Sequence, residues 1–450
     1  MRSYLVLIPL IVILAGAPAS GENTVKMGLR EAVETALKDN PRIKASTWGL
    51  KAVQEDVGIA RSYYLPSLTF EDRYMRTDNP TYAFMAKLNQ QRFTASDFDI
   101  NSLNSPQAVN DFQGSVKLEQ VIFSERAITG LRMAKLESKA SGQDFERLRE
   151  KVTQDVISAY LGVITSRHFA DVAEQGVKDA GEHKRLATLR YNTGLGLYSD
   201  VLRAEAAQKE AERKLSAAQK ANEVAKRALG LALGRSESVD AIGTGYKVTL
   251  EPIDAYYGGL EKRPDIQALE TRTKNAENGV TLAKSGYLPE VGVGGQYQWN
   301  DHSSPLGAEG SSYMVNAFLR WSIFDGARRE HQVSQARAKA EEARQYLEGL
   351  KKQARFQVFD SYKSVEEAQK SLDLANAELS AAEEGTRLVT LRYQNSLSPI
   401  IDVLDSQLML DAARTGVVEA QNNLMEKFFN LGFESGMINE FIQKINSYKE

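Results

Sequence analysis

The chain alternates between two hydrophobic periods. Over most of its length, apolar and small residues recur every three or four positions, which places them on one face of an α-helix. In four short stretches, apolar residues instead alternate with polar ones, as in a β-strand with one apolar face. The longest helical stretches, 125–192 and 326–395, contain no proline. At ~1.5 Å per residue, each helix would be on the order of 100 Å long.

The order of predicted elements occurs twice. Pro41 and Pro66 are separated by the same interval as Pro264 and Pro289, and each second proline ends a Tyr-Leu-Pro motif. A duplication with a fixed internal order indicates one architectural unit used twice. The first repeat is 20–250, with helices in 28–63, strands 64–76 and 111–123, long helix 125–192 and return helix 199–233. The second is 251–436, with helix 264–286, strands 288–300 and 312–324, long helix 326–395 and return helix 398–431, followed by a C-terminal tail, 437–450.

Each long helix ends in a matching turn. Thr-Leu-Arg-Tyr occurs at 188–191 and 390–393, and Asp-Val-Leu occurs at 200–202 and 402–404, so both motifs are offset by the same number of residues. Gly194 interrupts the first helical pattern, because glycine tolerates the positive φ of a tight reversal. The sequence therefore predicts two helical hairpins with equivalent tips.

The helices carry a second, finer pattern. Apolar and small residues keep a 3.5-residue spacing on the second long helix, at Val365, Ala368, Leu372, Ala375, Leu379 and Ala382. This period predicts supercoiled pairing between neighbouring helices. The segments that connect the strands, 75–110 and 301–312, are rich in turn residues, and we expect exposed loops there.

The strands leave two interpretations open. Alternation over about ten residues is typical of membrane strands around a wet lumen, and equally of a soluble sheet with one buried face. Residues 1–19 read as a secretory leader, with Arg2 before a short apolar run and a small-residue cleavage pattern ending at Ala19. Four strands are too few to close a membrane sheet, so membrane strands would have to combine between chains: eight in a dimer or twelve in a trimer.

Composition narrows the function classes. The net charge of −3 gives no basic surface for nucleic acid, and the absence of cysteine removes a lipid anchor on that residue. The four histidines are scattered, without metal-ligand spacing among them: His168, His183, His302 and His331. The glycines at 292–295 lie in a strand pattern with no following helix, so they are not a phosphate loop. The sequence predicts no enzyme, no cofactor and no metal centre.

The duplication, the Gly-Leu-Arg-Glu-Ala-Val segment at 28–33, Asn40-Pro41, both Tyr-Leu-Pro motifs and the paired tips together resemble the TolC family of outer-membrane efflux proteins. The resemblance implies a mixed α and β membrane protein of a Gram-negative bacterium. It implies a homotrimer with a twelve-stranded β-barrel among outer-membrane lipids and an α-helical barrel in the periplasm. A periplasmic adaptor and an inner-membrane transporter would be its partners.

The function implied is export in a tripartite efflux system. A type I protein secretion duct of the same fold is an alternative, and a periplasmic coiled-coil scaffold is the alternative outside the channel class. The sequence does not choose among drugs, metal ions and polypeptides as cargo.

The resemblance also implies two groups of site residues at the tips. A periplasmic gate with an acidic ring that binds cations would comprise Asp402, Asp405, Asp200, Ser199 and Tyr393. The adaptor would contact Gly194, Leu195, Ser396 and Leu397. The sequence departs from the best-known form at Ser396 and Ser398, where that form has a glycine and an arginine. The alternative roles are local: acids that favour the helix dipole, and residues that merely form the turn.

Overall fold

The computed structural model describes residues 24–243 and 248–447, so the leader expected at 1–19 lies outside the described residues. The chain forms two compact units. The strand unit comprises Ala45–Leu148 and Tyr257–Gln357, and the hairpin unit comprises Met1–Lys44, Arg149–Tyr256 and Val358–Glu450. Helices α5 (Glu125–Asn192) and α9 (Arg328–Gln394) contribute residues to both units.

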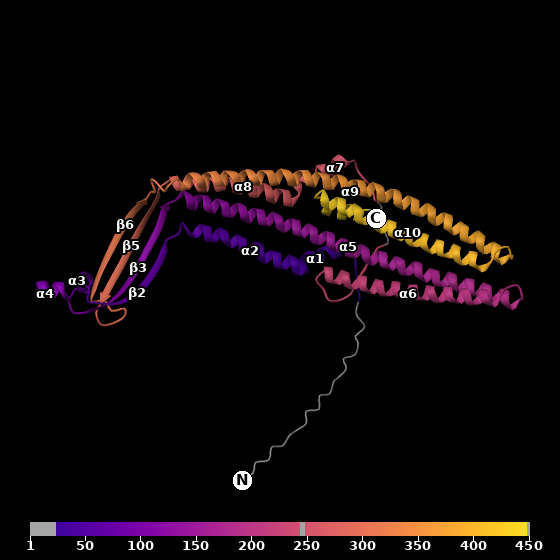
Figure 1. Cartoon of the computed structure of the whole chain (residues 1–450), viewed down its shortest axis with the longest axis horizontal. Helices are drawn as coiled ribbons and strands as arrows, with labels where there is room; N and C mark the ends of the chain where they lie inside the picture. Colours follow the sequence, from indigo (N-terminus) through magenta and orange to yellow (C-terminus); the bar gives the residue numbers. More distant parts are fainter. Residues whose placement is uncertain (1–23, 244–247, 448–450) are drawn as a thin grey trace, which may run out of the picture. The chain divides into compact units, whose positions relative to one another are not determined.

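The strand unit contains one antiparallel four-stranded sheet in the order β2-β3-β5-β6 (Figure 1). Its strands are β2 (Ser67–Thr77), β3 (Val109–Phe123), β5 (Glu290–Asp301) and β6 (Gly310–Arg320). Both repeats therefore contribute two neighbouring strands to a single sheet. Strands β2 and β6 are its edges, and each pairs with one strand of the described chain.

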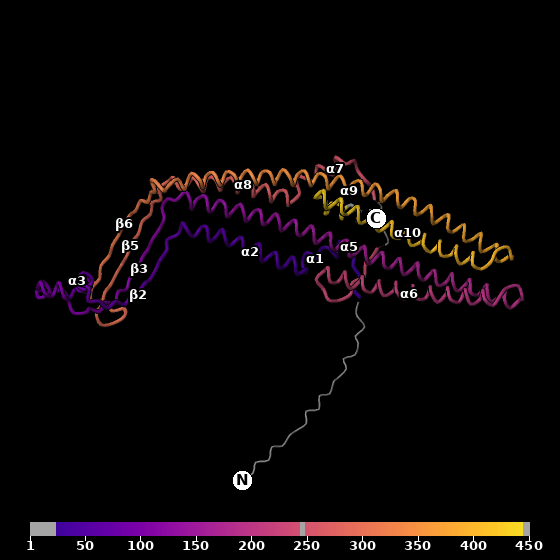
Figure 2. Tube along the Cα trace, viewed as in Figure 1, coloured from indigo at the N-terminus to yellow at the C-terminus, as the bar shows by residue number. Residues whose placement is uncertain are grey.

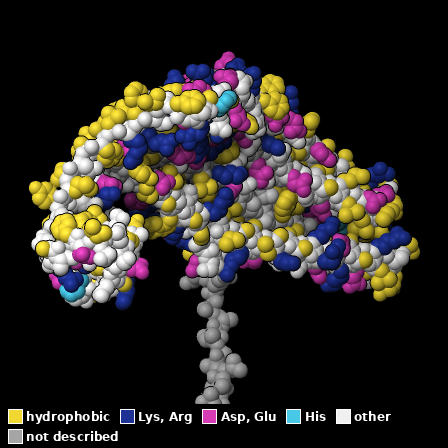
Figure 3. Space-filling model, turned by 60° about the vertical axis from the view of Figure 1, so that its left-hand side comes forward, with side chains coloured by type: hydrophobic (Ala, Val, Ile, Leu, Met, Phe, Trp, Pro, Cys, Tyr) yellow, Lys and Arg dark blue, Asp and Glu magenta, His cyan; other side chains and the backbone are white. Residues whose placement is uncertain are grey.

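The register gathers the apolar positions on one face of this sheet. Phe70 pairs with Val116, Val116 with Tyr297, and Tyr297 with Tyr313, and paired residues share a face. The face is open: Leu68 is 69% exposed and Tyr313 is 82% exposed. Hydrophobic side chains are visible on the surface of the molecule in Figure 3. The interpretation as a soluble sheet requires this apolar face to be buried. Within the described residues, the chain leaves it exposed.

The connection between β2 and β3, expected as an exposed loop, is partly helical. It contains α3 (Pro80–Asn89), the 3-10 helix η1 (Ala95–Phe98) and α4 (Ile100–Asn104). The turn residues that suggested a loop are helix caps. The Asn79 side chain accepts a hydrogen bond from the amide of Tyr82, and the Asp99 side chain caps α4. Ala83 and Ala86 of α3 pack against Val109.

Helix α8 (Pro264–Lys284), followed by the 3-10 turn η3 (Ser285–Tyr287), lies beside α5 and α9 within the strand unit. Arg272 of α8 pairs with Asp144 of α5 at 2.7 Å, and Lys351 of α9 pairs with Glu270 of α8 at 2.8 Å. These pairs are partly exposed, so each stabilises the contact by only about 0–1 kcal/mol. Helix α2 (Pro41–Ser62) has residues in both units.

The hairpin unit consists mainly of two antiparallel helix pairs (Figure 2). Helix α5 returns as α6 (Tyr198–Ala232), and α9 returns as α10 (Ile400–Glu434). The seam expected on the second long helix faces inward: Val365 and Ala368 are buried, and the other seam positions are half-buried. Alanine at these positions allows close helix packing. Within residues 24–243 and 248–447, no helix is long and apolar enough to cross a membrane.

Shorter elements complete the hairpin unit. Strand β1 (Val25–Met27) pairs in parallel with β4 (Val239–Ala241), which lies in the segment that joins the repeats. The hydroxyl of Tyr160 on α5 donates to the carbonyl of Ile242, next to β4, at 2.5 Å, and it lies 3.2 Å from the carbonyl oxygen of Met27 in β1. The remaining elements are α1 (Leu29–Asp39), α7 (Ile253–Tyr257) and α11 (Ile438–Ser447); the 3-10 turn η2 (Leu260–Lys262) belongs to the strand unit.

The C-terminal segment from 437, which the sequence analysis left as a tail, contains helix α11. Phe441 packs on Phe428 of α10, with ring centroids 4.5 Å apart. Helix α11 forms because its apolar residues recur at helical spacing and Ile438 and Phe441 are buried.

Candidate functional site

The two hairpin tips have the same backbone geometry. In the first, Gly194 has φ of +75° and its amide donates to the Tyr191 carbonyl at 3.0 Å. In the second, Ser396 has φ of +64° and its amide donates to the Tyr393 carbonyl at 3.0 Å. In each tip, the next amide donates to the carbonyl of the arginine before the tyrosine, which completes a Schellman motif. The sequence repeat is therefore a structural repeat at this position.

The side chains at the two tips differ. Tyr191 is 45% exposed, whereas its counterpart Tyr393 is 3% exposed. Tyr393 belongs to an apolar cluster that joins both hairpins, with Ala187, Ala204, Ile400 and Val403. Its hydroxyl is buried without a hydrogen-bond partner among the described residues. Burial raises the pKa of Tyr393, Arg190 opposes this rise, and Asp200 adds to it.

Arg190 connects the first tip to the second. Its guanidinium lies 4.6 Å from the centroid of the Tyr393 ring. It donates to the Tyr393 carbonyl, to Ser396 Oγ at 3.0 Å and to the Leu195 carbonyl of its own tip at 3.1 Å. The sequence analysis missed this residue. The feature that could have located Arg190 is the repeated Thr-Leu-Arg-Tyr motif. Arg190 belongs to its first copy, and the exposed Arg392 belongs to its second copy.

The predicted gate residues occupy two environments. Tyr393 is buried and Asp200 is half-buried, and the two are close enough for the Asp200 charge to act on the phenol. Asp402 and Asp405 are exposed, one turn apart on α10, and their side chains form no hydrogen bond or ion pair with the described residues. Ser199 is also exposed. One chain therefore does not bring all five residues together, and it leaves two carboxylates free for other contacts.

The predicted adaptor-contact residues lie at the ends of the hairpins. Leu195 is 68% exposed and Leu397 is 67% exposed, at equivalent positions of the two turns. Gly194 and Ser396 are exposed beside them. Ser398, at the position where the best-known form of the TolC family has an arginine, has a buried hydroxyl without a hydrogen-bond partner among the described residues.

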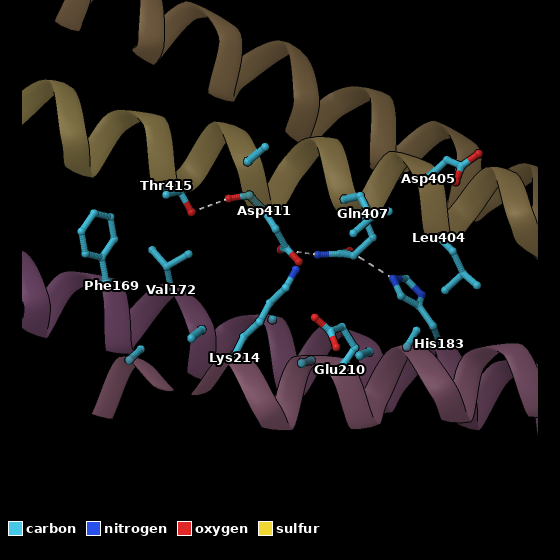
Figure 4. Close-up of a pocket in the computed structure, with 18 of the residues that line it drawn as sticks. Phe169, Val172, His183, Glu210, Lys214, Leu404, Asp405, Gln407, Asp411 and Thr415 are labelled. Atoms are coloured by element: carbon cyan, nitrogen blue, oxygen red, sulfur yellow. Dashed lines mark hydrogen bonds between the residues drawn. The ribbon is translucent and has the colours of Figure 1, made fainter. Parts of the chain in front are cut away.

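A groove of about 850 Å³ lies farther from the tips, between α5, α6 and α10 (Figure 4). Its walls are largely alanine and other apolar side chains, and its polar residues come mainly from α10. Gln407 lies between two helices: its amide donates to Asp411 at 2.9 Å and to Asp179 of α5 at 3.1 Å. Its Oε1 lies 3.1 Å from Nε2 of His183 on α5. Asp405 also lines this groove.

This network combines partly buried carboxylates with one arginine. Arg414 donates to Asp179 at 2.6 Å, and its nitrogen lies 3.7 Å from Asp411. Burial raises the pKa of Asp411, and the neighbouring Asp179 adds to the rise, while Gln407, Arg414 and Lys214 oppose it. The sequence analysis missed these residues because their partners lie more than two hundred positions away in the chain.

Comparison with known proteins identifies the family. The family model for outer membrane efflux proteins matches residues 32–235 and 256–432. The chain belongs to this family. Outer membrane efflux protein BepC of Brucella suis is 21% identical over 423 residues, which are 93% of this chain and 87% of BepC.

Solved structures have the same fold. The outer membrane protein VceC of Vibrio cholerae has a TM-score of 0.74 at 19% identity, covering 91% of this chain and 96% of VceC. A membrane protein from Pseudomonas aeruginosa has a TM-score of 0.76 at 19% identity, covering 91% of this chain and 93% of that protein. The prediction of the family, its mixed α and β fold and its outer-membrane efflux function is confirmed.

Proposed function

We propose that three copies of this outer membrane efflux protein assemble into one duct, whose twelve strands lie in the outer membrane and whose hairpins form the periplasmic part. The observation that carries the proposal is the sheet of the strand unit. It has an exposed apolar face and two edges, β2 and β6, that pair on one side only within the described chain. In lipid, open backbone groups at such an edge are costly, and joining β2 of one copy to β6 of the next satisfies them.

Cross-linking between edge strands tests the assembly directly. The chain has no cysteine, so introduced pairs are the only thiols. Thr69→Cys in β2 is combined in turn with Ser312→Cys or Asn316→Cys in β6. Oxidation of the detergent-purified protein should give covalent dimers and trimers for at least one pair. The matched control carries a single Ser115→Cys in the inner strand β3, which should remain monomeric on denaturing gels. Only monomers from every edge pair, together with a monomeric mass in detergent, would contradict the proposal.

In this assembly the hairpin tips close the periplasmic end. Asp402 and Asp405 of three copies supply six carboxylates that no other described side chain neutralises. Such a ring attracts cations and repels anions. Tyr393, Asp200 and Ser199 belong to the same gate, and Arg190 holds the two tips of each copy together.

Outer membrane efflux proteins work with a periplasmic adaptor and an inner-membrane transporter, and the tips are the surface we assign to the adaptor. Leu195 and Leu397 project from equivalent turns and are both largely exposed. Apolar side chains at the end of a polar hairpin fit a partner that buries them. The alternative of a periplasmic coiled-coil scaffold is not favoured, because a water-soluble scaffold would leave the apolar face of the sheet exposed to water.

A further inference from the structure

We propose that the connection between β5 and β6 holds a zinc ion on Asp301, His302 and Glu309. Asp301 is the last residue of β5, and β6 begins at Gly310, so residues 302–309 form the whole connection. One ligand atom from each of the three side chains lies within 4.8 Å of the others. The proposed export function does not use this site.

The histidine of the cluster lies against one of its two carboxylates. His302 Nδ1 lies 2.7 Å from Oε1 of Glu309. This contact is an ion pair when the imidazole is protonated, and Nδ1 makes no further hydrogen bond with the described residues, although the His302 side chain as a whole is 39% exposed. A cation that accepts a lone pair from each atom would satisfy both, because imidazole nitrogen and carboxylate oxygen are ordinary zinc ligands.

The aspartate is already held in place. One oxygen of Asp301, Oδ1, accepts hydrogen bonds from the amide of Ser303 at 2.7 Å, from its hydroxyl at 2.9 Å and from the amide of Ser304 at 2.9 Å. The other oxygen, Oδ2, makes no hydrogen bond with the described residues. Hydrogen bonds to one side of a ligating group orient its other side toward a metal.

The loop closes around that second oxygen. A β carbon added at Gly307 would lie 2.1 Å from Asp301 Oδ2, so only glycine allows this approach. The second oxygen of Glu309, Oε2, accepts a hydrogen bond from the amide of His302 at 3.3 Å, which fixes this carboxylate as well. The three donors are therefore positioned by the backbone of a short connection.

The donor set selects the ion. Two carboxylates and one neutral imidazole carry a charge of −2, which balances a divalent cation. Calcium and magnesium prefer sites made entirely of oxygen, whereas zinc accepts a mixed nitrogen and oxygen set. The side chains of His302 and Glu309 are 39% and 31% exposed, which leaves room for water as a fourth ligand.

Titration of the full chain with zinc tests the site. The protein is purified in detergent without a histidine tag, stripped with a chelator and titrated with zinc chloride by calorimetry. We expect one zinc ion per chain, and no comparable binding of magnesium or calcium. His302→Ala and Glu309→Gln should each weaken binding by at least about tenfold. His331→Ala, which removes an exposed histidine on α9, is the matched control and should bind like the unaltered protein.

Two results would overturn the proposal. The first is absence of zinc binding by the unaltered chain, which would leave only an ion pair between His302 and Glu309. The second is zinc binding that His302→Ala and Glu309→Gln do not change, which would place the ion elsewhere. Because Glu309→Gln keeps the size of the side chain, equal elution volume and helical content of this variant exclude misfolding as the cause of lost binding.

Discussion

Arg190 of the first hairpin covers the ring of Tyr393 of the second, with its guanidinium carbon 4.6 Å from the ring centroid. The same guanidinium reaches the backbone and the hydroxyl of the second tip. The two tips of one chain are therefore joined by a single, half-buried side chain. Its counterpart in the second repeat, Arg392, is exposed, so the arginine of the duplicated motif joins the tips only in the first repeat.

Replacing Arg190 should separate the tips. Arg190→Gln removes a cation–π contact worth about 0.5–2 kcal/mol, and thus raises the population with separated tips roughly two- to thirtyfold. Spin labels on Leu195→Cys and Leu397→Cys report the distance between tips by pulsed electron resonance. The distribution should broaden toward longer distances in Arg190→Gln. Arg392→Gln is the control, and an equal broadening there would contradict the role of Arg190.

Removing the tip carboxylates should change ion flow. With Asp402→Asn and Asp405→Asn together, we expect weaker block by multivalent cations and reduced preference for cations in planar bilayers, because the acidic ring is gone. Asp373→Asn, which neutralises an exposed carboxylate on α9, should have no such effect. Unchanged block in the double variant would assign the two aspartates to the helix dipole instead.

Replacing the tip leucines should weaken the adaptor. Burying one leucine contributes about 1.5–3 kcal/mol, so Leu195→Ser and Leu397→Ser should each reduce adaptor affinity by about ten- to a hundredfold. Affinity of the purified protein for its adaptor is the measurement. The control is Leu231→Ser at the far end of α6, where the leucine is 75% exposed. Equal affinity for all three variants would remove the tips from the contact surface.

Two glycines with positive φ should differ in their tolerance of alanine. Gly194 has open space around it, so Gly194→Ala should cost roughly 1–2 kcal/mol from the left-handed backbone alone. At Gly234, an added β carbon would also lie 2.6 Å from the Asp39 carbonyl oxygen, which adds about 1–3 kcal/mol. Thermal unfolding followed by circular dichroism should rank the variants in that order. A lower midpoint for Gly194→Ala would contradict the assignment.

The stability of the hairpin unit should depend on Asp411. Burial raises the pKa of Asp411 above the ordinary value of 3.8, so the folded state favours the protonated carboxyl. Its stabilising contribution to the free energy of unfolding is fully present below the unfolded pKa and is lost as pH rises through the folded pKa. Asp411→Asn does not ionise and keeps an oxygen for Gln407. We therefore expect it to be more stable than the unaltered protein at pH 7, with the difference shrinking toward pH of about 4.

Asp179→Asn is the opposing control, because it removes the negative charge that lies 2.6 Å from Arg414 and should destabilise the protein at pH 7. If Asp411→Asn is also less stable at pH 7, attraction by Arg414 outweighs burial at that carboxylate. Both variants can be compared by unfolding in denaturant at several pH values.

The sequence was most informative where one signal extends over many residues. The helix expected at 125–192 is α5, because a cap residue, Ser124, and glycines after Asn192 bound a long periodic run. The sheet was also accessible, since alternation in four stretches specifies which residues share a face. The short helices α3 and α4 between β2 and β3 were missed, because the same turn residues occur in loops and at helix caps.

The site was predictable only in part. The duplicated motif located both tips, but it could not say that Tyr191 is exposed and Tyr393 buried, because that asymmetry comes from packing between hairpins. Nor could it pair His183 with Gln407, which lies far along the chain. The histidines were compared only with one another, so the carboxylates beside His302 were overlooked.

The pairing of β1 with β4 has a consequence for how the chain matures. Val25 meets Val239, so the earliest described strand finds its partner only after the whole first repeat has been made. Val25–Met27 therefore stays unpaired until β4 has been synthesised. Contacts between residues far apart in the chain are associated with slow folding, so we expect this small parallel ribbon to form late. The ribbon therefore ties the beginning of the described chain to the end of the first repeat.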